Sequence, residues 1–317
     1  MIKWVIPDNM KLRGLNYWML DFMQRNPDFF IKNAEVAVAY GIMHDTILSG
    51  GRVTATETIS SLRDMRSILT RYNEHHVRYH LVLTQPNIKD EYLTDFWANK
   101  QLELVEEFGG GVILASDKLA KYVIEKYPKL KIIASTTKMN NTETFLKNIE
   151  NKEIPYDILV LNTANNFDYD FIPSEYRHKI EILIDDCCPP LCYKRAFCYN
   201  NSALANLGDD IGRKYPCNNE PKHMTSWTKY PTVEESRIKY KEFLRHHTRK
   251  DVDKAHEDGF ELMKFSGREA LVFNVLKEYG YYMATPEKEY AFIVEGIDSL
   301  LDREYWNLIK QKGNGDF

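Results

Sequence analysis

Short apolar runs recur along the whole chain, separated by longer stretches in which apolar residues return every three or four positions. Eight runs stand out: residues 3–6, 35–40, 77–84, 111–115, 131–135, 156–161, 181–184 and 260–265. Most of them are continuously apolar rather than alternating, which is typical of parallel strands buried on both faces. The pattern therefore predicts strands that alternate with helices.

The intervals between these runs have helical spacing. Thr54-Ala-Thr-Glu57 has the spacing of a capping box and opens a predicted helix over residues 54–73. Further helices are predicted over 90–108, 117–126 and 141–151, and residues 267–312 indicate two more after the last strand. The alternation favours an α/β fold, a closed (β/α)8 barrel of the TIM type in one domain over residues 1–317. An open, doubly wound sheet would show the same alternation and is the alternative.

One interval between runs is far longer than the others. Residues 185–259 separate the seventh run from the eighth, whereas βα loops typically have about 2–6 residues. This insertion contains all five cysteines and ends in a charged stretch, residues 233–257, that is predicted to be one long helix.

Composition narrows the possible functions. The formal net charge is −4, so no global positive field attracts nucleic acid or anionic lipid. The first residues become polar too early for a signal peptide, and no later stretch is apolar enough to cross a membrane, so we expect a cytoplasmic protein without membrane contact. In a reducing compartment, five cysteines crowded into one insertion favour metal or redox chemistry over disulfides.

The cysteines begin directly after the seventh run, in Ile184-Asp-Asp-Cys-Cys-Pro-Pro-Leu-Cys-Tyr-Lys-Arg-Ala-Phe-Cys198. The carboxyl ends of barrel strands form the active-site face, so these cysteines are expected there. Four thiolates suit either tetrahedral zinc or an iron-sulfur cluster. The predicted ligands are Cys188, Cys192, Cys198 and Cys217, with Cys187 as the alternate to Cys188. Cysteines without a metal are a further alternative.

Three motifs lie at the ends of predicted strands or after them. The second run ends in Val38-Ala39-Tyr40-Gly41 and is followed by Gly50-Gly51-Arg52, and the cysteine-rich segment follows a late strand. The third motif is Met263-Lys264-Phe265-Ser266-Gly267-Arg268 on the last strand. Together these motifs resemble the peptidase U32 family, whose LKIEGR segment is similar to the third. The family includes ubiquinone-hydroxylation proteins and hydroxylation factors for tRNA and rRNA. The resemblance implies a [4Fe-4S] cluster and an oxidoreductase that hydroxylates an aromatic small molecule or a nucleobase without oxygen.

The sequence departs from that family beside the cysteines. Asp185-Asp186 stands where the family has His-Gly, and the spacing of the paired cysteines differs by one residue, so the four ligands do not map one to one. Three hypotheses follow: an iron-sulfur-dependent modifying enzyme, a peptidase-type hydrolase in keeping with the family's name, and a non-catalytic subunit. In the third hypothesis, the metal only attaches the insertion to the barrel, and a protein partner catalyses the reaction.

Further candidates follow the ends of predicted strands. Arg52 and Arg268 would clamp a carboxylate or phosphate of the substrate, or pair with a nearby acidic residue. Asp185 and Asp186 would act as a general base, accept hydrogen bonds beside the metal, or cap the turn. Polar residues that would line the same mouth follow four other strands: Gln85, Ser116, Thr136 and Asn162.

A basic stretch, Arg237 to Lys254, holds seven Lys or Arg residues and two histidines against three acidic residues. A basic helix with interleaved aromatic residues can contact an RNA or DNA backbone, and the same composition also occurs on solvated helix faces.

Overall fold

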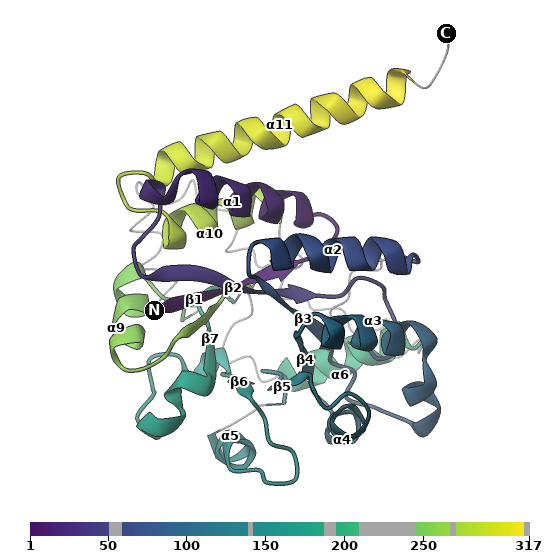
Figure 1. Cartoon of the computed structure of the whole chain (residues 1–317). Helices are drawn as coiled ribbons and strands as arrows, with labels where there is room; N and C mark the ends of the chain where they lie inside the picture. Colours follow the sequence, from purple (N-terminus) through teal and green to yellow (C-terminus); the bar gives the residue numbers. More distant parts are fainter. Residues whose placement is uncertain (51–58, 139–141, 187–194, 209–244, 267–270, 314–317) are drawn as a thin grey trace.

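Eight parallel strands pair in chain order and close into a barrel (Figure 1). This computed structural model describes residues 1–50, 59–138, 142–186, 195–208, 245–266 and 271–313. The barrel prediction is confirmed, and the open-sheet alternative is wrong. The strands are β1 (Ile2–Asp8), β2 (Ala34–Gly41), β3 (Arg78–Leu83), β4 (Gly111–Leu114), β5 (Lys131–Ala134), β6 (Ile158–Val160), β7 (Ile180–Leu183) and β8 (Leu262–Lys264).

Helices cover the outside of the barrel in Figure 1. They are α1 (Arg13–Arg25), α2 (Leu62–Glu74), α3 (Phe96–Glu107), α4 (Asp117–Lys126), α5 (Thr142–Ile149), α6 (Arg195–Asn206), α9 (Arg249–Glu257), α10 (Val272–Met283) and α11 (Glu289–Gly313). Short 3-10 helices lie at Pro27–Phe29, Asp90–Thr94, Thr163–Asn165 and Ser174–Lys179. None of the helices in the described part of the chain has the length and apolarity needed to cross a membrane.

The aromatic packing of β1 and β8 identifies the two faces of the barrel wall. Trp4 lies 5.5 Å from Phe265, and Phe265 lies 5.6 Å from Tyr282 on α10, so these rings point outward to the helices. Successive residues of a strand point to opposite faces. Val5 and Lys264, which pair with each other, therefore lie on the inward face.

Two predicted helices are not continuous over their predicted ranges, and the predicted capping box Thr54–Glu57 lies outside the described residues. α2 begins at Leu62, because Ser61 caps it by accepting a hydrogen bond from Asp64 N. Ile59 instead belongs to a loop, where its N–H donates to Met43 O. The predicted helix over residues 90–108 is divided into a 3-10 helix and α3, because the Asp95 side chain caps α3 at Ala98 N.

The long charged helix predicted over residues 233–257 is also wrong. Thr248 and Asp251 form a capping box, so α9 begins only at Arg249. Residues 245–248 are not helical, and Arg245 has a positive φ of 55°, whereas residues 233–244 of the predicted helix lie outside the described part of the chain. Earlier in the insertion the structure has a helix that the sequence pattern did not predict, α6.

A cluster of aromatic rings attaches α11 to the rest of the fold. Phe292 is fully buried, and its ring lies 5.3 Å from Trp18, 5.5 Å from Phe30 and 5.8 Å from Phe22. In Figure 1, α11 runs along α1 and α10 and then extends beyond them. Only its first part is therefore fixed by this cluster.

Phe292→Ala is expected to lower the free energy of unfolding by about 3–5 kcal/mol, because it removes a buried ring and leaves a cavity. Urea denaturation measures the change. Tyr290→Ala, on the same helix at 80% exposure, is the matched control and should change it by less than about 0.5 kcal/mol. Equal effects of the two substitutions would contradict the packing of α11 in solution.

Candidate functional site

The carboxyl ends of β7 and β8 are joined by Asp185, at the barrel mouth where the sequence predicted it. Asp185 Oδ1 accepts a hydrogen bond from Ser266 N at 2.5 Å, and Asp185 O accepts one from Ser266 Oγ at 2.8 Å. The residue is buried. These bonds brace two short strands at the rim, so the Asp185 carboxylate has a structural role beside any catalytic one.

Asp186, the last described residue before the cysteines, is held by a segment near the end of the insertion. Its carbonyl oxygen accepts a hydrogen bond from His246 Nε2 at 2.7 Å. His247 N donates to Ile184 O at 2.9 Å, and His247 Nε2 lies 2.7 Å from Tyr169 Oη. Both imidazoles are buried. The beginning of the insertion and a segment near its end therefore meet at the end of β7.

The helix α6 is attached to the loops that follow β2 and β3. Gln85 Nε2 donates to Ala203 O at 3.2 Å, and Asn206 Nδ2 donates to Gly50 O. Asn87 Nδ2 donates to Asn200 Oδ1 at 2.8 Å. In the sequential strand order, β3 and β7 are four strands apart, on opposite sides of the barrel. The mouth therefore has Asp186 on one side and α6 on the other.

Cys198 lies on α6 and is half-buried. The other predicted ligands and both predicted substrate-binding arginines lie outside the described residues: Cys187, Cys188, Cys192, Cys217, Arg52 and Arg268. Within the described ranges, no group of three His, Cys, Asp or Glu side chains is placed to hold a metal ion. The ligand set thus stays a prediction.

An ionisable cluster that the sequence analysis missed lies inside the barrel. Lys264 Nζ forms an ion pair with Glu181 Oε1, and the two residues are 5% and 0% exposed. The Lys264 ammonium also lies 3.9 Å from the centre of the Tyr40 ring. Tyr40 pairs with His80 in the β2–β3 register, so the two share the inward face.

His80 is neutral in this environment. It is 2% exposed, and burial, followed by the positive charge of Lys264, lowers the pKa of His80 to about 3. Neither His80 Nδ1 nor Glu181 Oε2 has a hydrogen-bond partner among the described residues. Buried ion pairs and unpaired polar atoms cost stability, and they occur often at functional sites.

The signal for this cluster was present in the sequence. Glu181, Lys264 and His80 are ionisable residues that each belong to a run assigned to a buried strand. Charged residues are almost never fully buried unless they are paired. A glutamate and a lysine in neighbouring buried strands therefore indicated a pair, but only the strand order brings them together.

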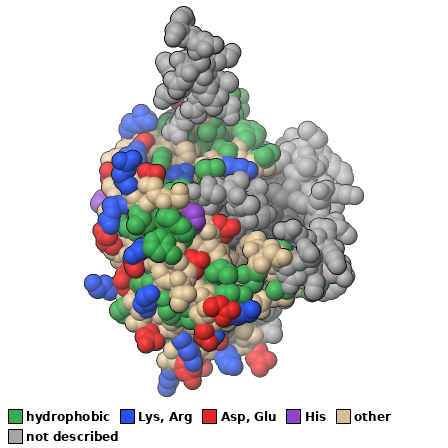
Figure 2. Space-filling model, turned by 90° about the vertical axis from the view of Figure 1, so that its right-hand side faces the viewer, with side chains coloured by type: hydrophobic (Ala, Val, Ile, Leu, Met, Phe, Trp, Pro, Cys, Tyr) green, Lys and Arg blue, Asp and Glu red, His purple; other side chains and the backbone are tan. Residues whose placement is uncertain are grey.

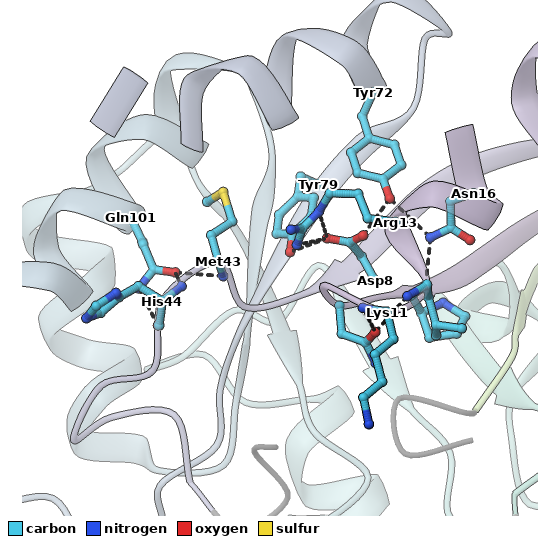
Figure 3. Close-up of polar contacts among 12 residues, drawn as sticks. Asp8, Lys11, Arg13, Asn16, Met43, His44, Tyr72, Tyr79 and Gln101 are labelled. Atoms are coloured by element: carbon cyan, nitrogen blue, oxygen red, sulfur yellow. Dashed lines mark hydrogen bonds and ion pairs between the residues drawn. The ribbon is translucent and has the colours of Figure 1, made fainter. Parts of the chain in front are cut away.

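A second buried network surrounds Asp8 at the carboxyl end of β1 (Figure 3). Its carboxylate accepts hydrogen bonds from Tyr72 Oη at 2.7 Å and Tyr79 Oη at 3.1 Å, and it pairs with Arg13 at 2.8 Å. Burial disfavours the charge of Arg13, but Asp8 outweighs it and raises the pKa of Arg13 above its usual value. The network joins β1, α1, α2 and β3, and it holds these four elements together at this side of the barrel mouth.

The second group in Figure 3 attaches the loop after β2 to α3. Gln101 Oε1 accepts hydrogen bonds from Met43 N and His44 N, both at 3.0 Å, and Gln101 Nε2 donates to His44 O at 2.9 Å. The side chain is fully buried. The loop that leads toward Gly50 is thereby fixed at its base.

Two of the polar residues predicted to line the mouth bond to nearby backbone. Asn162 Oδ1 accepts a hydrogen bond from Ala164 N, and Thr136 Oγ1 donates to Leu161 O. Gln85 holds α6, and Ser116 precedes α4 without a side-chain cap bond. These residues lie at the strand ends as expected, and the bonds of Gln85, Thr136 and Asn162 organise the rim.

In the described part of the basic stretch, residues 245–254, several basic side chains form hydrogen bonds or ion pairs. Arg245 Nε donates to Asn166 O at 2.9 Å, Arg249 pairs with Glu289 at 2.8 Å, and Lys254 pairs with Asp258 at 2.6 Å. On the molecular face in Figure 2, basic and acidic side chains are interspersed over the described surface. Contact with RNA or DNA through this stretch stays a prediction.

Asp8→Asn is expected to lower the free energy of unfolding by about 3–5 kcal/mol, because it leaves the charge of Arg13 buried without its partner. Urea denaturation measures the change. Asp21→Asn, which removes the carboxylate of a half-exposed pair with Arg71, should cost less than about 1 kcal/mol. A similar loss in both variants would show that the buried pair contributes no more than the exposed one.

His80 should make stability depend on pH. Because the pKa of His80 is about 3 in the folded protein and 6.5 is its ordinary value, the unfolded chain binds the extra proton between these limits. Stability therefore falls as the pH decreases through this window. Between pH 7 and pH 5, the wild type should lose about 2 kcal/mol more than His80→Gln in urea denaturation. His178→Gln, at an exposed histidine, should keep the wild-type dependence.

No protein-family model and no curated protein matches this sequence. Among solved structures, the chain is similar to one described as "The Structure of the U32 Peptidase Mk0906", with a TM-score of 0.45 and 13% sequence identity. The alignment covers 84% of this chain and 93% of that chain. A likeness at this level carries no argument about activity, and the family resemblance of the motifs stays a prediction.

Proposed function

We propose that this chain is an enzyme with its active site at the barrel mouth, built around an iron-sulfur cluster on cysteine thiolates. One observation carries the proposal. Asp186, directly before the first cysteine in the chain, is attached at the mouth through His246, and α6, which carries Cys198, is attached there through Gln85. The described residues on either side of Cys187, Cys188 and Cys192 in the sequence therefore both belong to the mouth.

The chemistry of the donor set agrees with this proposal. In it, Cys188, Cys192, Cys198 and Cys217 hold a [4Fe-4S] cluster, with Cys187 as the alternate to Cys188. Cys198 is half-buried, as a ligand at the edge of a cavity would be. A bound cluster would supply electron transfer at a potential set by its surroundings. Zinc on the same thiolates is the competing occupant.

The residues of the mouth would orient the substrate and move protons. His246 fixes the peptide oxygen of Asp186, the residue immediately before the first cysteine in the sequence. The Asp186 side chain would accept a proton, and Arg52 and Arg268 would bind an anionic part of the substrate. The family resemblance favours hydroxylation or a related modification of an aromatic small molecule or a nucleobase.

Cys198→Ala is expected to lose most of the iron, because one of four thiolates is removed. The full chain is purified without oxygen, and its iron, zinc and visible absorption are measured. The wild type should be brown with about four irons per chain. Ser202→Ala, one turn further along α6, is the matched control and should keep the wild-type iron content.

A colourless wild type with about one zinc per chain would overturn the cluster and leave a structural or hydrolytic metal site. Full iron in Cys198→Ala would exclude Cys198 from the ligand set.

A further inference from the structure

A groove at the barrel rim lies between α6 and the loop that follows β3. Its volume is about 590 Å³, and small-molecule sites have volumes of about 300–1,000 Å³. One wall contains Ile88 and Tyr92 of the loop, and the other contains Leu204 and Leu207 of α6. All four side chains are half-buried, so both walls present apolar surface to the groove.

The two walls are held in place by contacts beside the groove. Ile88 and Tyr92 pack against the hydrophobic core, which fixes the loop wall. The α6 wall is attached through the fully buried Gln85, whose Nε2 donates to Ala203 O at 3.2 Å. The groove is therefore preformed when α6 is docked, and a ligand would not have to open it.

Lys89 is the one charged side chain among the described residues that line the groove. Its ammonium lies 5.6 Å from the centre of the Tyr92 ring. The nearest acidic partner, Glu91, is 3.8 Å away, and the two side chains are 65% and 68% exposed. Because an exposed ion pair of this kind contributes little to stability, Lys89 can pair with an incoming anion at low cost.

The other polar groups along the groove already form hydrogen bonds. Leu204 O accepts from Leu207 N and Ala205 O accepts from Gly208 N, both at 3.0 Å. Asn87 Nδ2 donates to Asn200 Oδ1 at 2.8 Å. A ligand in the groove thus meets two apolar walls and one positive charge.

This combination selects the chemistry of the ligand. A cation would be repelled by Lys89, and a neutral apolar molecule would gain nothing from it. A flat ring that carries a carboxylate matches the whole set, because the ring packs against Tyr92 and the two leucines while the carboxylate pairs with Lys89.

We propose that the groove between α6 and the loop after β3 binds an aromatic carboxylate. This site goes beyond the proposed metal chemistry and does not depend on it, since no thiolate takes part in the binding. A ligand that contacts both walls also stabilises the docked position of α6, the helix that carries Cys198.

The test compares 2-naphthoate with 2-naphthamide, which has the same ring system and a neutral head group. Binding to the full chain is measured by isothermal titration calorimetry. The wild type should bind 2-naphthoate about fivefold more tightly than the amide, because only the carboxylate pairs with Lys89. Equal affinity for both compounds, or no binding of 2-naphthoate, would overturn the proposal.

Lys89→Gln should remove this preference and leave the affinity for the amide unchanged. Lys118→Gln is the matched control, because the Lys118 ammonium pairs with Asp90 at 2.8 Å and does not line the groove. It should keep the wild-type preference. A preference that survives in Lys89→Gln would contradict the assignment of Lys89.

Leu207→Trp tests the place of binding. The larger side chain fills part of the groove and should weaken the binding of both compounds about tenfold. Leu301→Trp, at a leucine that is 57% exposed on α11, is the matched control and should bind as the wild type does. Unchanged affinity in Leu207→Trp would place the ligand elsewhere and overturn the proposal.

Discussion

The pairing of β8 with β1 closes the sheet, and every position at the mouth depends on that closure. Because all eight strands run in the same direction, their carboxyl ends form a single rim. β6 and β8 have only three residues each, so few backbone bonds hold this side of the barrel. Side chains add to them: Asp185 joins the ends of β7 and β8, and Tyr40 Oη donates to Phe265 O across β1 at 2.7 Å.

The strands could be predicted because burial on both faces leaves a continuous apolar run, and all eight runs contain strands. Helix starts were harder, because several side chains in one stretch can cap a helix. Thr54 and Ser61 both offer a cap upstream of α2; Thr54 lies outside the described residues, and Ser61 caps the helix that begins at Leu62. The break before α9 depends on Thr248 and Asp251 within a stretch whose composition is helical throughout.

The location of the site was predictable from chain order, because a segment that follows a barrel strand must emerge at the rim. Asp185 and Asp186 are therefore found where the sequence placed them. The interior cluster was not predicted, because Glu181 and His80 are far apart in the sequence and only the barrel register brings them to one face. The role of Gln85 was also hidden, since its partner, Ala203, belongs to a helix with no clear sequence signal.

The attachment of α6 also has a consequence for the order of folding. Gln85 and Ala203 are 118 residues apart in the chain, and Gly50 and Asn206 are 156 apart. Contacts of such long range close large loops and form slowly, whereas each βα unit is local. We therefore expect the helix that carries Cys198 to dock after the first strands have paired, so that the mouth is completed late in folding.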